Sequence, residues 1–201
     1  MGSDSSSRDE VLRALRAARV EPCPLPEVKL AGVRYADILA QFAQSVADVG
    51  GRCVIVENAD ADIEAELARI PEYTAAKRVL SLVSGVKKAN VDWERAAEVE
   101  HSGDIDFCVL AGKLGVAENG AVWVVDDGSS RRAGWFLAEH MALIVRSGDI
   151  VHNMHEAYER IQVGGRGFAM FISGPSKTAD IEQSLVIGAQ GPRSCTVLVV
   201  K

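Results

Sequence analysis

Apolar residues follow two patterns between residue 35 and the end of the chain. In one pattern they recur every three or four positions, as at Ile38, Phe42 and Val46, which predicts a helix that ends at the glycine pair 50–51. In the other pattern nearly every position of a short run is apolar, which predicts strands that are covered on both faces. We expect such strands at residues 53–56, 79–83, 106–113, 121–125, 141–145, 168–172 and 196–200.

Helical spacing returns between these strands. It predicts one helix over residues 63–70, closed by Pro71, and another over residues 154–161. The link 114–120 is too short for a parallel crossover, so part of the sheet should be antiparallel. The fold class that follows is α/β, with a mixed, mostly parallel sheet flanked by helices.

The first thirty residues form a separate prediction. Ser7 and Glu10 have the spacing of a capping box, and the apolar residues behind them predict a helix. The prolines in residues 22–26 then stop that helix and predict an extended connector. We therefore expect an N-terminal helix and linker over residues 1–30 and one α/β domain over residues 31–201.

Composition narrows the functional classes. The 201 residues are 48% apolar and 25% charged, with a net charge of −6 and no basic run, which argues against a nucleic-acid partner. No apolar segment approaches the ~20 residues of a membrane span. We also see no secretory signal, and the four cysteines lack metal-ligand spacing, so we expect a cytoplasmic protein with reduced thiols. No cofactor-binding motif is evident.

The segment 173–182 follows a predicted strand and is the strongest candidate for a binding loop. Gly174 and the proline after it predict a turn, and Ser176 or Thr178 could cap a short helix whose open N–H groups suit an anion. Lys177 would add a cation. The segment lacks the spacing of a nucleotide-binding P-loop. A capped helix with Asp180 in its first turn for dipole reasons is an equally good interpretation.

A second loop, residues 188–193, precedes the last strand. Its glycines allow close backbone approach, and Arg193 offers a forked donor for a carboxylate. Loops at the carboxyl ends of strands converge on the ligand crevice of an open sheet, which places segment 173–178 there. A plain turn with a solvated arginine is the alternative for this loop.

Two further side chains could carry chemistry. Glu118 lies in the glycine-flanked link 115–120 and could act as nucleophile or base, although Asn119 and Gly120 favour a simple hairpin turn. His140 precedes a strand beside a carboxylate and could move a proton near neutral pH.

Together these motifs resemble the LUD-domain family, whose namesake is the lactate utilisation protein C group. The resemblance rests on residues 115–120, on His140, on the sequence Gly-Pro-Ser-Lys-Thr-Ala-Asp-Ile-Glu at residues 174–182 and on residues 188–193. It implies the fold of glucosamine-phosphate deaminases, ribose-phosphate isomerases and CoA transferases. It also implies a part in oxidising L-lactate to pyruvate beside iron–sulfur partner subunits. Lys177 stands where the family more often has arginine, and Gln190 where it typically has histidine.

We therefore expect a protein that binds a small carboxylate or phosphate anion, with Glu118 and His140 as tentative catalytic residues. Two alternatives stay open: acyl-CoA chemistry with Glu118 as nucleophile, and a non-enzymatic assembly subunit. The expected partners are a small anionic metabolite, possible iron–sulfur subunits and a possible second copy of the chain. The expected binding residues are Gly174, Ser176, Lys177, Thr178, Asp180, Gln190 and Arg193.

Overall fold

The structure is a computed structural model, and it divides the chain into two compact units, Met1–Ala31 and Gly32–Lys201. The first unit contains α1 (Ser7–Ala17), the helix expected from the capping box, and none of the side chains of α1 is buried. The second unit contains the sheet. The residues that the structure describes are 7–18, 20, 23–24, 32–57, 63–92, 105–126, 133–161, 167–178, 186–189 and 191–201.

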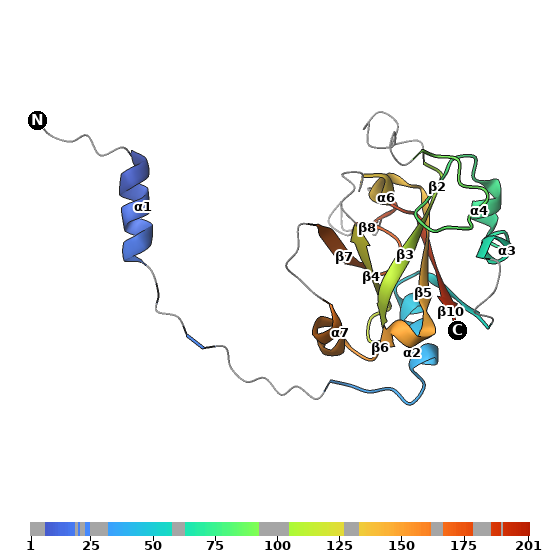
Figure 1. Cartoon of the computed structure of the whole chain (residues 1–201), viewed down its shortest axis with the longest axis horizontal. Coiled ribbons are helices and arrows are strands. Elements are labelled where there is room, and N and C mark those ends of the chain that lie inside the picture. The colour runs from blue at the N-terminus through green and yellow to red at the C-terminus, as the bar shows by residue number, and fades with distance from the viewer. Residues whose placement is uncertain are drawn as a thin grey trace, which may run out of the picture. The chain divides into compact units, whose positions relative to one another are not determined.

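An eight-stranded sheet forms the centre of the second unit (Figure 1). The pairs β1–β10, β10–β5, β5–β3, β3–β2 and β3–β6 are parallel, whereas β3–β4 and β4–β7 are antiparallel. The expected α/β fold with a mixed, mostly parallel sheet is therefore confirmed. The strands are β1 (Arg52–Val56), β2 (Val79–Ser81), β3 (Phe107–Val116), β4 (Ala121–Asp126), β5 (His140–Arg146), β6 (Ile150–Val151), β7 (Phe168–Ile172) and β10 (Ser194–Val200).

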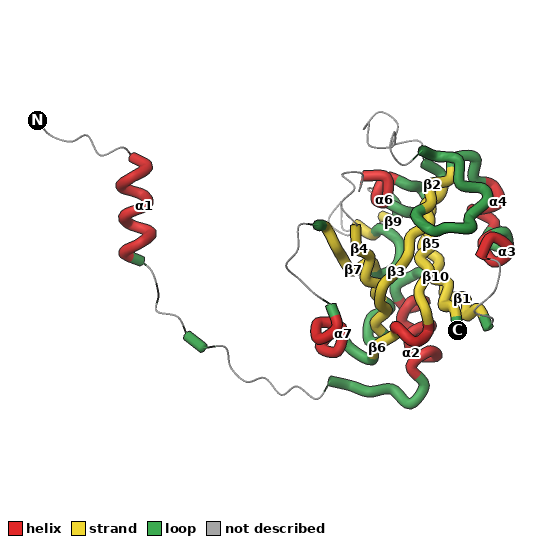
Figure 2. The backbone as a smooth tube through the Cα atoms, viewed as in Figure 1, coloured by secondary structure: helices red, strands yellow, loops and turns green. Residues whose placement is uncertain are grey.

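Helices cover both faces of this sheet (Figure 2). α2 (Ile38–Asp48) packs on one face and contributes Phe42 to a core cluster that also contains Cys108 of β3. α3 (Ile63–Leu67) and α4 (Pro71–Ala75) lie on the other face, in a cluster that contains Phe107. The side chains of successive strand residues thus pack into core clusters on opposite faces of the sheet, which explains why the strands are apolar at nearly every position. The remaining elements are α6 (Ala133–Leu137), η2 (Ser147–Asp149), α7 (Met154–Arg160), β8 (Lys177–Thr178) and β9 (Val186–Ile187).

Two connections differ from the expectation. Pro71 does not only close a helix: it begins α4, because its fixed φ and missing N–H suit the first helical position. The link after β3 is shorter than expected, since the strand continues through Val116 and only residues 117–120 form the turn. In that turn Gly120 has a φ of +66° and its N–H donates to the carbonyl of Val116 over 2.9 Å. The hairpin interpretation of Asn119 and Gly120 is confirmed.

The expected helix cap at Ser176 is wrong. Lys177 and Thr178, which would begin that helix, instead form β8 and pair with Ile187 and Val186 of β9. The pairing depends on β9, eight to ten positions further along the chain, so the capping pattern at Ser176 gave no sign of it. The alternative cap at Thr178 concerns residues 179–185, which lie outside the described part of the chain.

Candidate functional site

The two predicted loops meet. The backbone N–H of Ser176 donates to the carbonyl of Pro192 over 2.8 Å, and the N–H of Gly188 donates to the carbonyl of Ser176 over 3.0 Å. The β8–β9 pairing adds to these bonds. We call the described residues 173–178, 186–189 and 191–193 the loop cluster. Because Ser176 N–H is already bonded, it is not one of the open donors that the sequence suggested for an anion.

The hairpin turn and the end of α2 anchor the loop cluster. Ser173 Oγ donates to the carbonyl of Asn119 over 2.8 Å, and Lys177 Nζ donates to the carbonyl of Val49, which caps the C-terminus of α2. Gly174 has a φ of +71°, and a Cβ at this position would lie 2.6 Å from the same Val49 oxygen. Only glycine fits this left-handed conformation and this close approach without strain.

A small pocket opens beside these contacts, which we call the loop pocket. Its volume is about 230 Å³, below the ~300–1,000 Å³ typical of sites for drug-sized ligands. Its size therefore suits a molecule of few atoms. Its lining combines two serines and two glycines with apolar side chains: Ser173, Gly174, Ser176 and Gly191, with Phe136, Met141, Met170, Phe171, Ile172, Pro175 and Pro192.

Lys177 does not line this pocket, but it is bonded to a carbonyl that lies close to it. Its ammonium contacts the Val49 carbonyl, which also lies against Gly174, a residue of the pocket lining. A cation at a helix C-terminus interacts favourably with the last carbonyls and the helix dipole. An ammonium carries three N–H donors, and the bond to Val49 occupies one. Lys177 is exposed, so its other donors can meet a ligand.

The side chain of Arg193 is paired with a residue outside the loop cluster. Its guanidinium donates to Glu139 Oε1 over 2.7 Å, and its backbone N–H donates to the carbonyl of Glu139 over 2.7 Å. The two side chains are 63% and 46% exposed, so the ion pair is worth only ~0–1 kcal/mol. The pair compensates the charge of Arg193, which leaves Lys177 as the better placed cation of the two.

Glu118 binds a helix start. Its side chain is exposed, and Oε2 accepts a hydrogen bond from the backbone N–H of Met154 over 2.9 Å. Met154 is the first residue of α7, after the N-cap Asn153, so the carboxylate also interacts with the positive end of the helix dipole. That bond engages Oε2, so an attack by this carboxylate on a substrate would come from Oε1.

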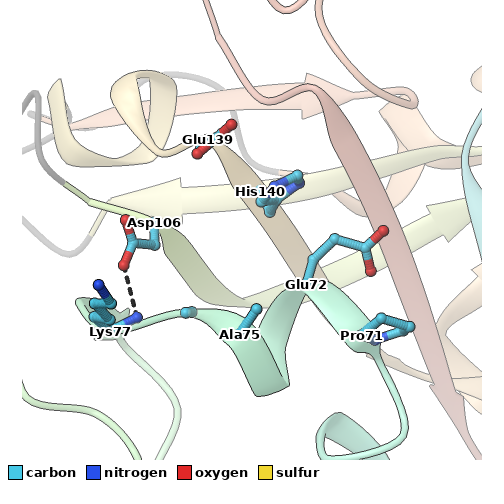
Figure 3. Close-up of a pocket in the computed structure, with 8 residues that line it drawn as sticks. Pro71, Glu72, Ala75, Lys77, Asp106, Glu139 and His140 are labelled. Atoms are coloured by element: carbon cyan, nitrogen blue, oxygen red, sulfur yellow. Dashed lines mark hydrogen bonds between the residues drawn. The ribbon is translucent and has the colours of Figure 1, made fainter.

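His140 lies in a second pocket, which we call the His140 pocket (Figure 3). Four parallel strands begin at this edge of the sheet, with Val79, Phe107, His140 and Ser194 in neighbouring register. The pocket has a volume of about 480 Å³ and lies between these strand starts and α4. Its charged and polar lining consists of Glu72, Lys77, Asp106, Glu139 and His140.

Hydrogen bonds fix two groups of the His140 pocket. His140 Nδ1 lies 2.8 Å from Ser194 Oγ. Asp106 Oδ2 accepts the backbone N–H groups of Lys77 and Arg78 over 2.6 Å and 2.8 Å. These bonds, that of Arg78 first, lower the pKa of the Asp106 carboxyl below its ordinary value of 3.8. The carboxylate therefore stays ionised at neutral pH.

The two pockets open on opposite faces of the sheet. His140 lines one and Met141 lines the other, and consecutive residues of a strand point to opposite faces. The predicted site residues are thus divided. Gly174 and Ser176 line the loop pocket. Lys177 and Thr178 are paired in β8 and do not line it, and Glu118 and His140 lie elsewhere. Asp180 and Gln190 lie outside the described residues.

Sequence reasoning missed the other charged residues of the His140 pocket. Glu72 is the second residue of the short helix α4, Lys77 follows the end of that helix, and Asp106 precedes β3. A proline at a helix start and an aspartate before a strand are common features, so no local signal distinguished them. Among the described residues no cluster of three or more histidine, cysteine or acidic side chains is arranged to hold a metal ion. Within the same residues, no helix has the length and apolar character that crossing a bilayer requires.

Comparison with known proteins identifies the family. The LUD domain model matches residues 60–200, more than half of the chain. The chain belongs to the LUD domain family. This confirms the resemblance that the motifs indicated. Because the match includes β10 and the loop cluster, the proposed anion site lies within the family's shared domain.

Individual relatives agree with this membership. The chain is 29% identical over 203 residues to a protein named lactate utilization protein C from Geobacillus thermodenitrificans, covering 96% of this chain and 80% of the relative. It is 28% identical, with the same coverage of both chains, to a protein of that name from Geobacillus kaustophilus. A crystal structure of a DUF162 family protein from Deinococcus radiodurans superposes with a TM-score of 0.60. At 19% identity, covering 85% of this chain and all of the other, that structure shows the shared fold.

Proposed function

We propose that this LUD-domain protein takes part in lactate utilisation and binds a small carboxylate, such as L-lactate or pyruvate, at the loop cluster. The observation that carries the proposal is the pair of backbone hydrogen bonds that join Ser176 to Pro192 and to Gly188. They bring the two predicted binding loops together beside a pocket whose size suits a molecule of few atoms. The relatives named lactate utilization protein C support lactate or its oxidation product as the ligand.

In this proposal Lys177 is the anchor for the carboxylate. Its contact with the Val49 carbonyl holds the ammonium near Gly174 and leaves two N–H donors for a ligand. The hydroxyl of Ser176 adds a further donor inside the loop pocket. The apolar side chains of Met141 and Met170 suit the methyl group of lactate or pyruvate.

Calorimetric titration with L-lactate and with pyruvate tests the proposal. We compare the wild type with Lys177→Met, which keeps the apolar stem and removes the charge, and with Lys113→Met, which changes an exposed lysine of β3. A hydrogen bond to a charged group is worth about 1.5–3 kcal/mol, so Lys177→Met should weaken binding about tenfold or more. Lys177→Arg should restore most of it, and Lys113→Met should match the wild type.

Equal affinity in Lys177→Met and the wild type would refute Lys177 as the anchor. An absence of heat in the wild type would refute small-carboxylate binding and favour the alternative of a non-enzymatic assembly subunit. The alternative of acyl-CoA chemistry predicts a covalent adduct on Glu118, which acyl-CoA followed by hydroxylamine trapping would detect. Iron–sulfur partner subunits, self-association and a cytoplasmic location stay predictions.

A further inference from the structure

The His140 pocket is rich in carboxylates, of which Glu139 is paired with Arg193 and Asp106 lies near the charges of Lys77 and Arg78. It contains the carboxylates of Glu72, Asp106 and Glu139 and the ammonium of Lys77. Asp106 already accepts two backbone N–H groups. Glu72 is half-buried, and no hydrogen bond or ion pair joins its carboxylate to another described residue. A carboxylate only accepts hydrogen bonds, so Glu72 is free to accept them from a ligand with N–H donors.

His140 offers a second acceptor in the same pocket. Nδ1 is hydrogen-bonded to Ser194 Oγ, which leaves Nε2 as the ring nitrogen available to a ligand. The proposal uses the tautomer in which Nδ1–H donates to the serine hydroxyl and Nε2 carries the lone pair, because a neutral imidazole has one donor and one acceptor. The ring of Phe107 lies 6.4 Å away between centroids and supports the imidazole from the strand next to it. Ser194 is therefore a positioning residue that holds the ring through Nδ1.

The wall opposite His140 has an apolar part beside Glu72 and Lys77. Pro71, Ala75 and Ala76 come from α4 and the residue after it, and Figure 3 shows this helix facing the start of β5. The volume of about 480 Å³ falls within the ~300–1,000 Å³ of typical small-molecule sites. A ligand here therefore has room for several carbon atoms beside its polar group.

We propose that the His140 pocket binds a small organic ammonium ion, separately from the carboxylate at the loop cluster. Its N–H groups donate to the Glu72 carboxylate and to Nε2 of His140, and its carbon atoms contact the apolar wall of α4. The carboxylate of Asp106 adds to the attraction for a cation and opposes an anion, which distinguishes this pocket from the one on the other face of the sheet. Lactate binding is not required for this proposal.

Histidine NMR with two isosteric probes provides the test. The chain has four histidines, so the His140 imidazole signal is assigned by comparison with His140→Gln. The protein is titrated at about pH 8, above the ordinary histidine pKa of about 6.5 and below that of alkylammonium ions, with n-propylammonium chloride. Sodium propionate serves as the anionic probe of the same size, and sodium chloride corrects for ionic strength.

We expect a saturable shift of the His140 signal with propylammonium and none with propionate. Glu72→Gln should weaken the apparent affinity about tenfold, whereas Glu159→Gln, an exposed glutamate of α7, should leave it unchanged. Ser194→Ala should weaken it and also change the nitrogen chemical shifts that report the His140 tautomer. The proposal is overturned by a saturable response to propionate, by no saturable response to propylammonium, or by equal affinity in Glu72→Gln and the wild type.

Discussion

Replacement of Gly174 by alanine tests how tightly the loop cluster is held against α2. The new Cβ would lie 2.6 Å from the backbone oxygen of Val49, and the residue would keep a φ of +71°. A left-handed conformation costs a non-glycine residue about 1–2 kcal/mol, and overpacking typically costs about 1–3 kcal/mol more. We therefore expect Gly174→Ala to lower the free energy of unfolding by roughly 2–5 kcal/mol.

Substitutions at two other glycines separate the backbone strain from the steric collision in the cost of Gly174→Ala. Gly85 has a φ of +87°, and a Cβ added there would have no other atom within 4 Å, so Gly85→Ala carries the backbone strain without the collision. Gly148 also has open space and lacks a positive φ, so Gly148→Ala should change stability by less than about 0.5 kcal/mol. Urea denaturation of the three variants, followed by circular dichroism, measures each effect. If Gly174→Ala were no less stable than Gly85→Ala, the close approach to α2 would be refuted.

Three further predictions follow from single contacts. Backbone hydrogen bonds lower the pKa of Asp106, so the wild type should be more stable than Asp106→Asn above about pH 4 and should lose this advantage as the pH falls below that value. A difference in urea midpoint that stays constant with pH would contradict this prediction. Ser45→Ala removes a buried 2.7 Å bond to the carbonyl of Ala117 and should cost about 1–3 kcal/mol, so an unchanged urea midpoint would argue against that bond. The exposed thiol of Cys23 should react quickly with a disulfide reagent, whereas Cys195, whose pKa burial raises to about 12, should react only on unfolding; fast labelling of Cys195 in the native protein would count against its burial.

The strands were predictable because each is buried on both faces. Phe107 and Cys108 enter different cores, so both positions must be apolar, and a continuous apolar run results. The same reasoning located β5 and β10 within two residues of their observed starts. The pairing of β8 with β9 was not predictable in this way. β8 arises because Lys177 and Thr178 meet β9, and nothing local to Ser176 distinguishes that pairing from a helix cap.

The segments 173–178 and 188–193 were predictable as loops from the sequence. The expectation that they come together is supported by the hydrogen bonds between them. The directions of their side chains depend on partners that are distant in sequence. Lys177 contacts Val49, which is 128 residues away, and Glu118 contacts Met154, which is 36 residues away. The His140 pocket was missed for a related reason: it lies at the starts of parallel strands, whereas the general rule for open sheets points to their carboxyl ends.

A crystal structure of the protein soaked with pyruvate tests the central claim most directly. The account predicts the carboxylate of pyruvate within hydrogen-bond distance of Lys177 Nζ, with the ligand beside Gly174 and Ser176 in the loop pocket. Pyruvate bound instead beside His140, on the opposite face of the sheet, would contradict it. So would a loop pocket that stays empty at pyruvate concentrations that saturate the protein in solution.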